Sequence, residues 1–173
     1  MTMNVEEYLD LVDENDNIIG REKRSVVHKN NLRNFRVINA FIINDEGKLW
    51  IPRRTADKAN DPLALDMSVG GHVESGSTYE ETLAKEAQEE LNIDVNEIQF
   101  KEVGYFKAGE HGLKCFQKVY EIRQNDAPKF NKEDFIGYYW LSPQELVDWV
   151  AKGEPAKFDL PILIKELYLR SQV

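Results

Sequence analysis

Residues Gly70 to Ile93 read GGHVESGSTYEETLAKEAQEELNI and decide the fold of this chain. The two glycines predict a turn, and the run after them has the apolar spacing of an amphipathic helix, which we expect from about Thr78 to Leu91. At roughly 100° per residue the apolar side chains share one broad arc, formed by Leu83, Ala84, Ala87 and Leu91. The stretch therefore predicts a glycine turn followed by a helix that packs on a core.

Three acids of this helix, Glu86, Glu89 and Glu90, share a neighbouring arc. Like charges at this spacing destabilise a helix by roughly 0.2–0.5 kcal/mol per pair, so a bound cation would explain their presence together. Carboxylate oxygens are the preferred ligands of hard divalent ions such as Mg²⁺ and Mn²⁺. A solvated acidic helix face is the alternative interpretation.

The same stretch resembles the Nudix box, G-x5-E-x7-R-E-U-x-E-E-x-G-U with U aliphatic, when its first glycine is placed on Gly71. The positions that match after this glycine are Glu86, Glu89, Glu90 and Ile93. The positions that depart are Ser77 for the first glutamate, Lys85 for the arginine, Asn92 for the last glycine, and the small Ala87 for a larger aliphatic residue.

Three of these departures have a physical interpretation. Ser77 and Thr78 both precede a glutamate by three residues, so either can form a capping box at the start of the helix. Lys85 keeps a positive charge beside the carboxylates but lacks the planar fork by which arginine binds a glutamate at two points. Asn92 tolerates the left-handed conformation that ends a helix.

The resemblance implies an α/β fold, the Nudix α/β/α sandwich with a mixed sheet, here preceded by an N-terminal β-hairpin. It also implies a hydrolase that depends on Mg²⁺ or Mn²⁺ and cleaves a diphosphate linkage in a nucleoside di- or triphosphate or a related nucleoside diphosphate derivative. On this resemblance Glu86, Glu89 and Glu90, with the carbonyl of Gly71, are the expected metal ligands. The same three glutamates and Asp134 are the expected catalytic residues.

Asp134 is selected because Nudix enzymes usually carry a further acid shortly before a tryptophan or similar residue, here Trp140. Glu133 is its neighbour and an alternative, and both acids could instead cap a turn. Glu86, Glu90 and Asp134 are all candidates for the general base that takes a proton from water.

The basic run Arg53-Arg54-Thr55-Ala56-Asp57-Lys58 precedes the segment that leads into the acidic helix. An acidic protein needs local cations to bind a phosphate substrate, so we expect Arg53, Arg54 and Lys58 to contact it. Surface ion pairs of an exposed loop are the alternative.

This basic run and the N-terminal region are similar to the Nudix branch that contains isopentenyl-diphosphate isomerases, in which a cysteine is a catalytic acid or base and several histidines hold a second metal. Here Gly70 stands at the cysteine position, His28 and His72 fit two of the histidine positions, and Phe35 stands at another. A glycine cannot move a proton, so we expect a hydrolase. An isomerase-like enzyme and a catalytically weakened Nudix domain that binds a nucleotide as a sensor are the alternatives.

The composition sets further bounds. A chain of 173 residues is long enough for one domain, 1–173, in which 1–33 form the hairpin and a connection and 34–173 the Nudix core. The net charge of −9 argues against polymeric nucleic acid and anionic membranes as partners and leaves a small anionic substrate. The single cysteine, Cys115, excludes an intramolecular disulfide, and with no apolar run of membrane-spanning length and no signal peptide we expect a cytoplasmic protein. The sequence does not specify an oligomeric state.

The remaining elements follow from alternation, turn residues and caps. We expect a polar connection of unspecified structure at 24–33 and a helix that starts at Ser142 and Pro143. The expected strands are Tyr8–Val12, Ile18–Glu22, Val37–Ile43, Lys48–Pro52, Gln99–Phe106, Lys114–Arg123 and Ile136–Leu141, and a last helix spans about Leu160–Leu169.

Overall fold

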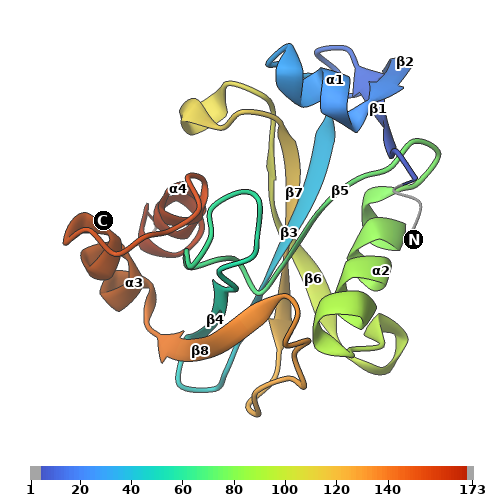
Figure 1. Ribbon diagram of the computed structural model, residues 1–173. Helices are drawn as coiled ribbons and strands as arrows, with labels where there is room; N and C mark the ends of the chain where they lie inside the picture. Colours follow the sequence, from blue (N-terminus) through green and yellow to red (C-terminus); the bar gives the residue numbers. More distant parts are fainter. Residues whose placement is uncertain (1–4, 171–173) are drawn as a thin grey trace.

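A six-stranded mixed sheet forms the centre of the structure, a computed structural model that describes residues 5–170 (Figure 1). Residues 1–4 and 171–173, which the predicted domain includes, lie outside the described residues. The strand order is β6-β7-β3-β4-β8, and β5 pairs with β3. The strands are β3 (Arg36–Ile43), β4 (Leu49–Arg54), β5 (Val69–His72), β6 (Phe100–Phe106), β7 (Phe116–Arg123) and β8 (Phe135–Leu141).

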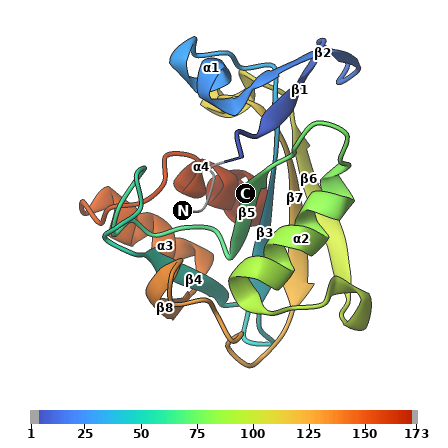
Figure 2. The same ribbon diagram turned by 45° about the vertical axis from the view of Figure 1, so that its right-hand side comes forward.

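Strand β3 divides the sheet. On one side it pairs in parallel with β7 along its whole length, from Arg36 to Ile43. On the other side only Ile43 pairs with β4, and residues Val37 to Ala40 pair with β5 instead. The second half of the sheet, β4 and β8, therefore diverges from β3 towards the Arg36 end, and Figure 2 shows β5 and the loops around it at this division.

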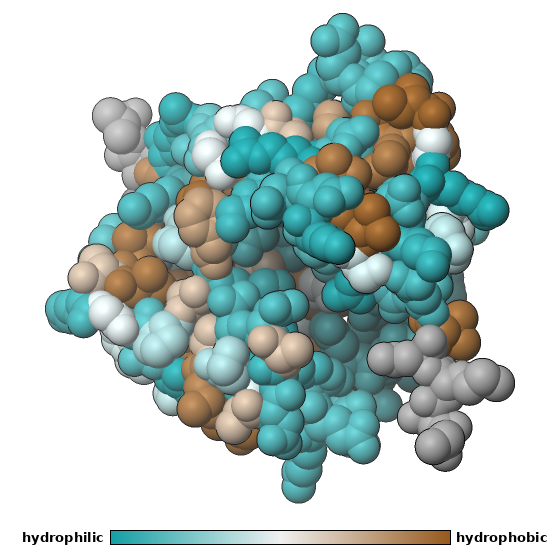
Figure 3. Space-filling model, turned by 45° about the horizontal axis from the view of Figure 1, so that its top comes forward, coloured by the Kyte–Doolittle hydropathy of each residue, from teal (hydrophilic) through white to brown (hydrophobic). Residues whose placement is uncertain are grey.

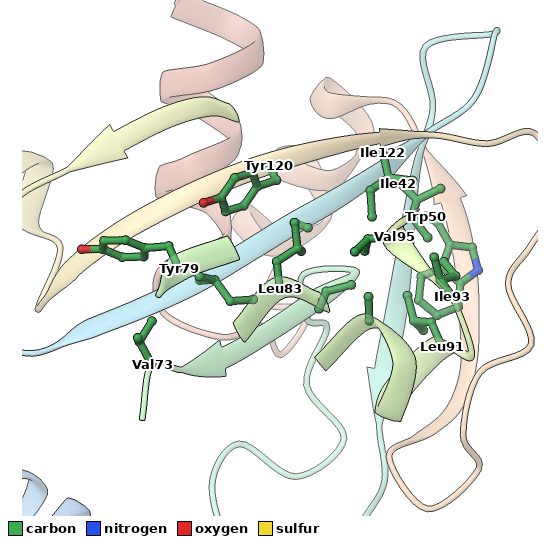
Figure 4. Close-up of a cluster of buried hydrophobic side chains, with 14 of the residues drawn as sticks. Ile42, Trp50, Val73, Tyr79, Leu83, Leu91, Ile93, Val95, Tyr120 and Ile122 are labelled. Atoms are coloured by element: carbon green, nitrogen blue, oxygen red, sulfur yellow. The ribbon is translucent and has the colours of Figure 1, made fainter. Parts of the chain in front are cut away.

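Helices cover both faces of the sheet, which confirms the predicted α/β/α layout. Helix α2 (Tyr79–Leu91) lies on one face, where its apolar arc packs on β3 and β7 (Figure 4). The other face is covered by α3 (Pro143–Ala151) and α4 (Leu160–Ile164), which continues into a π-helical turn (Lys165–Leu169). Alternate residues of β3 serve the two cores, because Ile38, Ala40 and Ile42 face α2 while Phe41 and Ile43 face α3 and α4.

The predicted N-terminal hairpin is confirmed as β1 (Tyr8–Val12) paired with β2 (Ile18–Lys23). It is followed by a short helix, α1 (Arg24–Lys29), in the segment for which the sequence predicted only a polar connection. Tertiary contacts hold this helix, since it has no side-chain cap and is too short to be stable alone. A small cluster of Leu9, Val27, Phe35 and Cys115 fixes the hairpin and helix to the sheet. Two 3-10 turns, Val95–Glu97 and Glu110–Gly112, complete the described elements.

The predicted glycine turn is wrong, because Gly70 and Gly71 lie within β5 and pair with Asn39 and Ile38. The end signals of α2 were correct. Asn92 adopts the left-handed conformation, with φ 54°. Of the two possible capping boxes the structure has the one at Thr78, whose hydroxyl accepts from the Glu81 N–H at 3.1 Å while the Glu81 carboxylate accepts from the Thr78 N–H at 2.8 Å.

Replacement of Thr78 tests this cap. Thr78→Ala removes the acceptor for the Glu81 N–H and should lower the free energy of unfolding by about 1 kcal/mol. Ser77→Ala is the matched control and should change stability by less than about 0.5 kcal/mol, because within residues 5–170 the Ser77 hydroxyl makes no hydrogen bond. Urea denaturation followed by circular dichroism measures both. A larger loss of stability for Ser77→Ala than for Thr78→Ala would show that Ser77, and not Thr78, caps the helix.

Candidate active site

A cleft of about 900 Å³ lies at the division of the sheet. One wall is formed by Glu86, Glu89 and Glu90 of α2, behind the glycines of β5. The opposite wall includes Arg54 at the end of β4, Lys58 in the following loop, and Asp134 just before β8. Figure 3 shows a largely hydrophilic face with a recess near its middle. The chain thus brings acids from one half of the fold opposite cations from the other.

The three glutamates differ in exposure. Glu89 is exposed, Glu86 is half-buried, and Glu90 has a fully buried Oε2 with no hydrogen-bond partner within residues 5–170. Burial, with the charge of Glu89, raises the pKa of Glu86 to about 7. Burial, with the charges of Asp66 and Glu86, holds the pKa of Glu90 well above its ordinary value. The acids therefore repel one another in a place where water solvates them poorly.

The donor set fits a hard divalent cation. All three side chains offer oxygen, which Mg²⁺ and Mn²⁺ prefer, and a cation would supply the partner that Glu90 Oε2 lacks. Within residues 5–170 no three His, Cys, Asp or Glu side chains already converge closely enough to hold a metal ion. A set of three carboxylate ligands is therefore not preassembled in the described residues.

Gly71 allows Glu86 to reach the cleft. A Cβ atom built on Gly71 would lie 2.6 Å from both Cγ and Cδ of Glu86, much closer than carbon atoms approach without overlap. The side chain of Glu86 thus passes over the strand at the one kind of residue that leaves room for it. This contact gives Gly71 a steric role in addition to the carbonyl ligand predicted from the sequence.

Two of the three predicted substrate-binding cations line the cleft, and each is paired. Arg54 Nη1 lies 2.7 Å from Oδ2 of Asp66, a buried carboxylate that the sequence did not single out. Lys58 Nζ lies 2.5 Å from Oδ1 of Asp134, so the structure joins two residues that were predicted separately. A bound anion would compete with both carboxylates for these cations.

The structure does not bring Arg53 into the cleft. Strand β4 extends to Arg54, and successive side chains of a strand point to opposite faces, so Arg53 and Arg54 diverge. Arg53 donates to the Glu154 carboxylate at 2.5 Å and to the Tyr139 hydroxyl at 3.2 Å. Arg53 was predicted to bind substrate because the basic run was expected to be a loop. Its observed contacts instead join β4 and β8 to the segment after α3.

Lys85 contacts Glu74 and none of the three helix glutamates. Its Nζ lies 2.6 Å from Glu74 Oε1, in an exposed pair that links α2 to the loop after β5. The helix position that resembles the Nudix arginine therefore braces the loop that leads into the helix. The positive charge that the sequence placed beside the helix carboxylates is thus paired with Glu74.

The end of the cleft near α1 carries aromatic rings and amides beside the ion pair of Arg24 and Glu7. The rings of Phe35 and His72 stack at 9° with centroids 5.6 Å apart, and His28 Nε2 lies 3.0 Å from His72 Nε2. The side-chain amide of Asn39 on β3 donates to the side-chain oxygen Oε1 of Gln117 on β7 at 2.8 Å. The sequence did not reveal this amide pair, because Asn39 and Gln117 lie within two separate expected strands. The available signal was an isolated amide in each strand.

Comparison with known proteins agrees with this architecture. Residues 33–161, which are most of the chain, match the NUDIX domain family model. The chain therefore belongs to the Nudix family and is a hydrolase of that family. An uncharacterized Nudix hydrolase of Nostoc sp. is 51% identical over 162 residues, 94% of this chain and 96% of that protein.

Two further comparisons describe the range of relatives. The crystal structure of DR0079 from Deinococcus radiodurans is similar with a TM-score of 0.88 and 43% identity, covering 94% of this chain and 99% of that one. An isopentenyl-diphosphate Delta-isomerase of Salmonella heidelberg is 24% identical over 139 residues, 78% of this chain and 77% of that protein. Among the described residues no helix is long and apolar enough to cross a membrane.

Replacing Gly71 tests the close approach of Glu86. Gly71→Ala places a methyl group in the path of the Glu86 side chain, which must turn away, and kcat/KM should fall at least about tenfold with little loss of stability. Gly137→Ala is the matched control, because a Cβ atom there has no neighbour within 4 Å. Activity of Gly71→Ala equal to that of Gly137→Ala would show that the Glu86 position does not matter.

His72 predicts a pH dependence of stability. Burial, with the nearby charges of Arg24 and His28, lowers the pKa of His72 to about 3, whereas the unfolded residue titrates near pH 6.5. The unfolded state binds the extra proton between these values, so the native state should lose up to about 1.4 kcal/mol per pH unit on acidification below about pH 6. His72→Asn should flatten this slope relative to the wild type in urea titrations, while His111→Asn should not. Parallel slopes for His72→Asn and the wild type would contradict a neutral His72 in the native state.

Proposed function

We propose that this hydrolase uses Mg²⁺ or Mn²⁺ to cleave a diphosphate linkage in a nucleoside di- or triphosphate or a related nucleoside diphosphate derivative. One observation carries the proposal. Glu86, Glu89 and Glu90 face Arg54 and Lys58 across one cleft, so a diphosphate can lie between a metal-binding wall and a cationic wall. A phosphate substrate is the ligand class that needs both walls at once.

The residues divide the chemistry between them. The three glutamates would hold the metal, which neutralises charge on the phosphate oxygens and makes a bound water more acidic. Arg54 and Lys58 bind oxygens of the phosphoryl group that does not react. One of Glu86, Glu90 and Asp134 accepts a proton from the attacking water. The water oxygen joins one phosphorus, and the bridging oxygen departs with the other phosphoryl group.

The aromatic end of the cleft near α1 supports a nucleoside as the group attached to the diphosphate. Phe35 and His72 present aromatic rings, and Asn39 and Gln117 present amides that a base or sugar can hydrogen-bond. A prenyl chain offers no hydrogen-bond donor or acceptor to the polar side chains that line this end of the cleft. The cleft is therefore better suited to a polar leaving group.

Gly70 separates this chain from the isomerases that its basic run and N-terminal region resemble. A Cβ atom on Gly70 would lie 3.1 Å from the amide oxygen of Asn39, so the side chain of Asn39 occupies the space next to the position of the isomerase cysteine. We place the chain in an isomerase-like branch of Nudix hydrolases, in which this exchange removes the proton-transfer group.

A substrate screen with defined variants tests the function. We expect hydrolysis of nucleoside di- or triphosphates or related derivatives with Mg²⁺ or Mn²⁺, abolished by EDTA and reduced by orders of magnitude in Glu89→Gln and Glu90→Gln. Glu97→Gln, on an exposed turn outside the cleft, is the charge-matched control. Release of phosphate or diphosphate measures the rate.

Other outcomes exclude this proposal. Full activity in EDTA or in both glutamine variants would remove the metal assignment. Interconversion of isopentenyl and dimethylallyl diphosphate, followed by NMR with a labelled substrate, would favour the isomerase. Tight nucleotide binding without turnover of any tested compound would favour a sensor.

A further inference from the structure

A buried carboxylate holds two cations beside the metal-binding wall. Asp66, whose side chain is 7% exposed, lies 2.7 Å from Arg54 Nη1 and 3.6 Å from Lys157 Nζ. The Met67 N–H also donates to Asp66 Oδ1, at 2.8 Å, which fixes the orientation of the carboxylate. The carboxylate of Asp66 is thus shared by two cationic side chains.

Lys157 is held at the cleft by its backbone. Its N–H donates to the Leu65 carbonyl at 2.9 Å, and the Leu65 N–H donates to the Pro155 carbonyl at 2.8 Å. A β-bridge between Leu65 and Ala156 completes this attachment of the segment between α3 and α4 to the segment before β5. The position of Lys157 is therefore set by the fold and does not depend on a mobile side-chain contact alone.

The ammonium group of Lys157 has hydrogen-bonding capacity to spare. Within residues 5–170 it makes no hydrogen bond, since its nearest acid, Asp66, is at 3.6 Å, yet it lines the cleft. Burial lowers the pKa of Lys157, but the neighbouring carboxylates Asp66, Asp159 and Glu90 raise it by more, so the group is charged at neutral pH. An ammonium ion with three donors and one distant acceptor is suited to receive an anion.

We propose that Lys157, positioned by Asp66 beside Arg54, binds the non-reacting phosphoryl group of the substrate and gives the site its preference for a diphosphate over a single phosphate. This inference rests on the proposed function and names a specificity-determining residue for it. Lys157 takes the place beside Arg54 that the basic run of the sequence suggested for Arg53.

The competing explanation is that Lys157 only neutralises Asp66. The two explanations predict different effects of a Lys157 substitution on the binding of one and of two phosphoryl groups. A purely structural lysine affects stability and leaves the relative affinity for one and two phosphoryl groups unchanged. A phosphoryl-binding lysine changes that ratio, because only the longer anion reaches it while its other phosphoryl group lies at the metal-binding wall.

The test measures binding of methylenediphosphonate and of inorganic phosphate to the Mg²⁺-loaded protein by isothermal titration calorimetry. Lys157→Met should weaken diphosphonate binding by about tenfold to a hundredfold and phosphate binding by less than about twofold. Lys157→Arg should recover most of the loss. Lys152→Met, an exposed lysine outside the cleft, should change neither affinity.

A double variant guards against misfolding. Removing Lys157 alone leaves Asp66 with one cation fewer, whereas Asp66→Asn with Lys157→Met removes both charges together. The double variant should fold and bind diphosphonate as weakly as the single one. With the hydrolysed nucleotide, Lys157→Met should raise KM by the same factor at nearly constant kcat, because the contact exists both before and during the reaction.

Two results would overturn the assignment. One is a lower melting temperature of Lys157→Met with unchanged diphosphonate affinity, and the other is an equal loss of phosphate and diphosphonate binding. Failure of the proposed function looks different. Wild-type protein that hydrolyses nothing but binds diphosphonate through Lys157 would refute the hydrolysis and keep the phosphoryl site.

Discussion

The close approach of the Glu86 side chain to Gly71 is the contact on which the site depends. Helix α2 buries its apolar arc on one face of the sheet, while the cleft opens where β4 leaves β3. Glu86 reaches that cleft because its side chain passes the strand at Gly71, where β5 is short and carries two adjacent glycines. A side chain at Gly71 would close this passage. The layered fold thus places the acids of α2 nearby, and the missing Cβ atom of Gly71 leaves room for the side chain of Glu86.

The cleft is also organised by ion pairs that a ligand must rearrange. Lys58 is bound to Asp134, and Arg54 is bound to Asp66, so the cationic wall is largely neutralised as it stands. The acids of α2 are unpaired by comparison, and burial raises the pKa of two of them. A cation on one wall and an anion on the other relieve both conditions together. This complementarity explains how a protein of net charge −9 can select a small anion at one place.

Local chemistry made much of the fold predictable. The arc of α2, the left-handed Asn92 and the cap of α3 at Ser142 are set by residues within a few positions of one another, and each was found from the sequence. The glycines of β5 were wrongly predicted to form a turn, because Gly in a sequence indicates a turn and a close contact with the backbone equally well. Helix α1 was missed because its stability comes from packing against the hairpin.

The site was less predictable for the same physical reason. Glu86, Glu89 and Glu90 share a helix face, which a periodic pattern reveals, whereas Arg53 and Arg54 are separated by the alternation of a strand whose end was placed too early. Asp66, Asn39, Gln117 and Lys157 meet only through tertiary contacts between segments far apart in the chain. A single sequence contains no short-range pattern for such long-range contacts. An isolated polar residue in an apolar run is the weak signal that remains.

The parallel pairing of β3 with β7 has a consequence for how the protein acquires its shape. A parallel pair cannot close through a tight turn, and here roughly 70 residues, including β4, β5, α2 and β6, separate the two strands. Folding must therefore close a long loop before the central strand gains its second neighbour, which slows the search for the native state. On the ribosome, α2 emerges well before β7 and before the segment with Lys157 that completes the cationic wall. The cleft that contains these acids thus lacks Lys157 until nearly the whole chain has been synthesised.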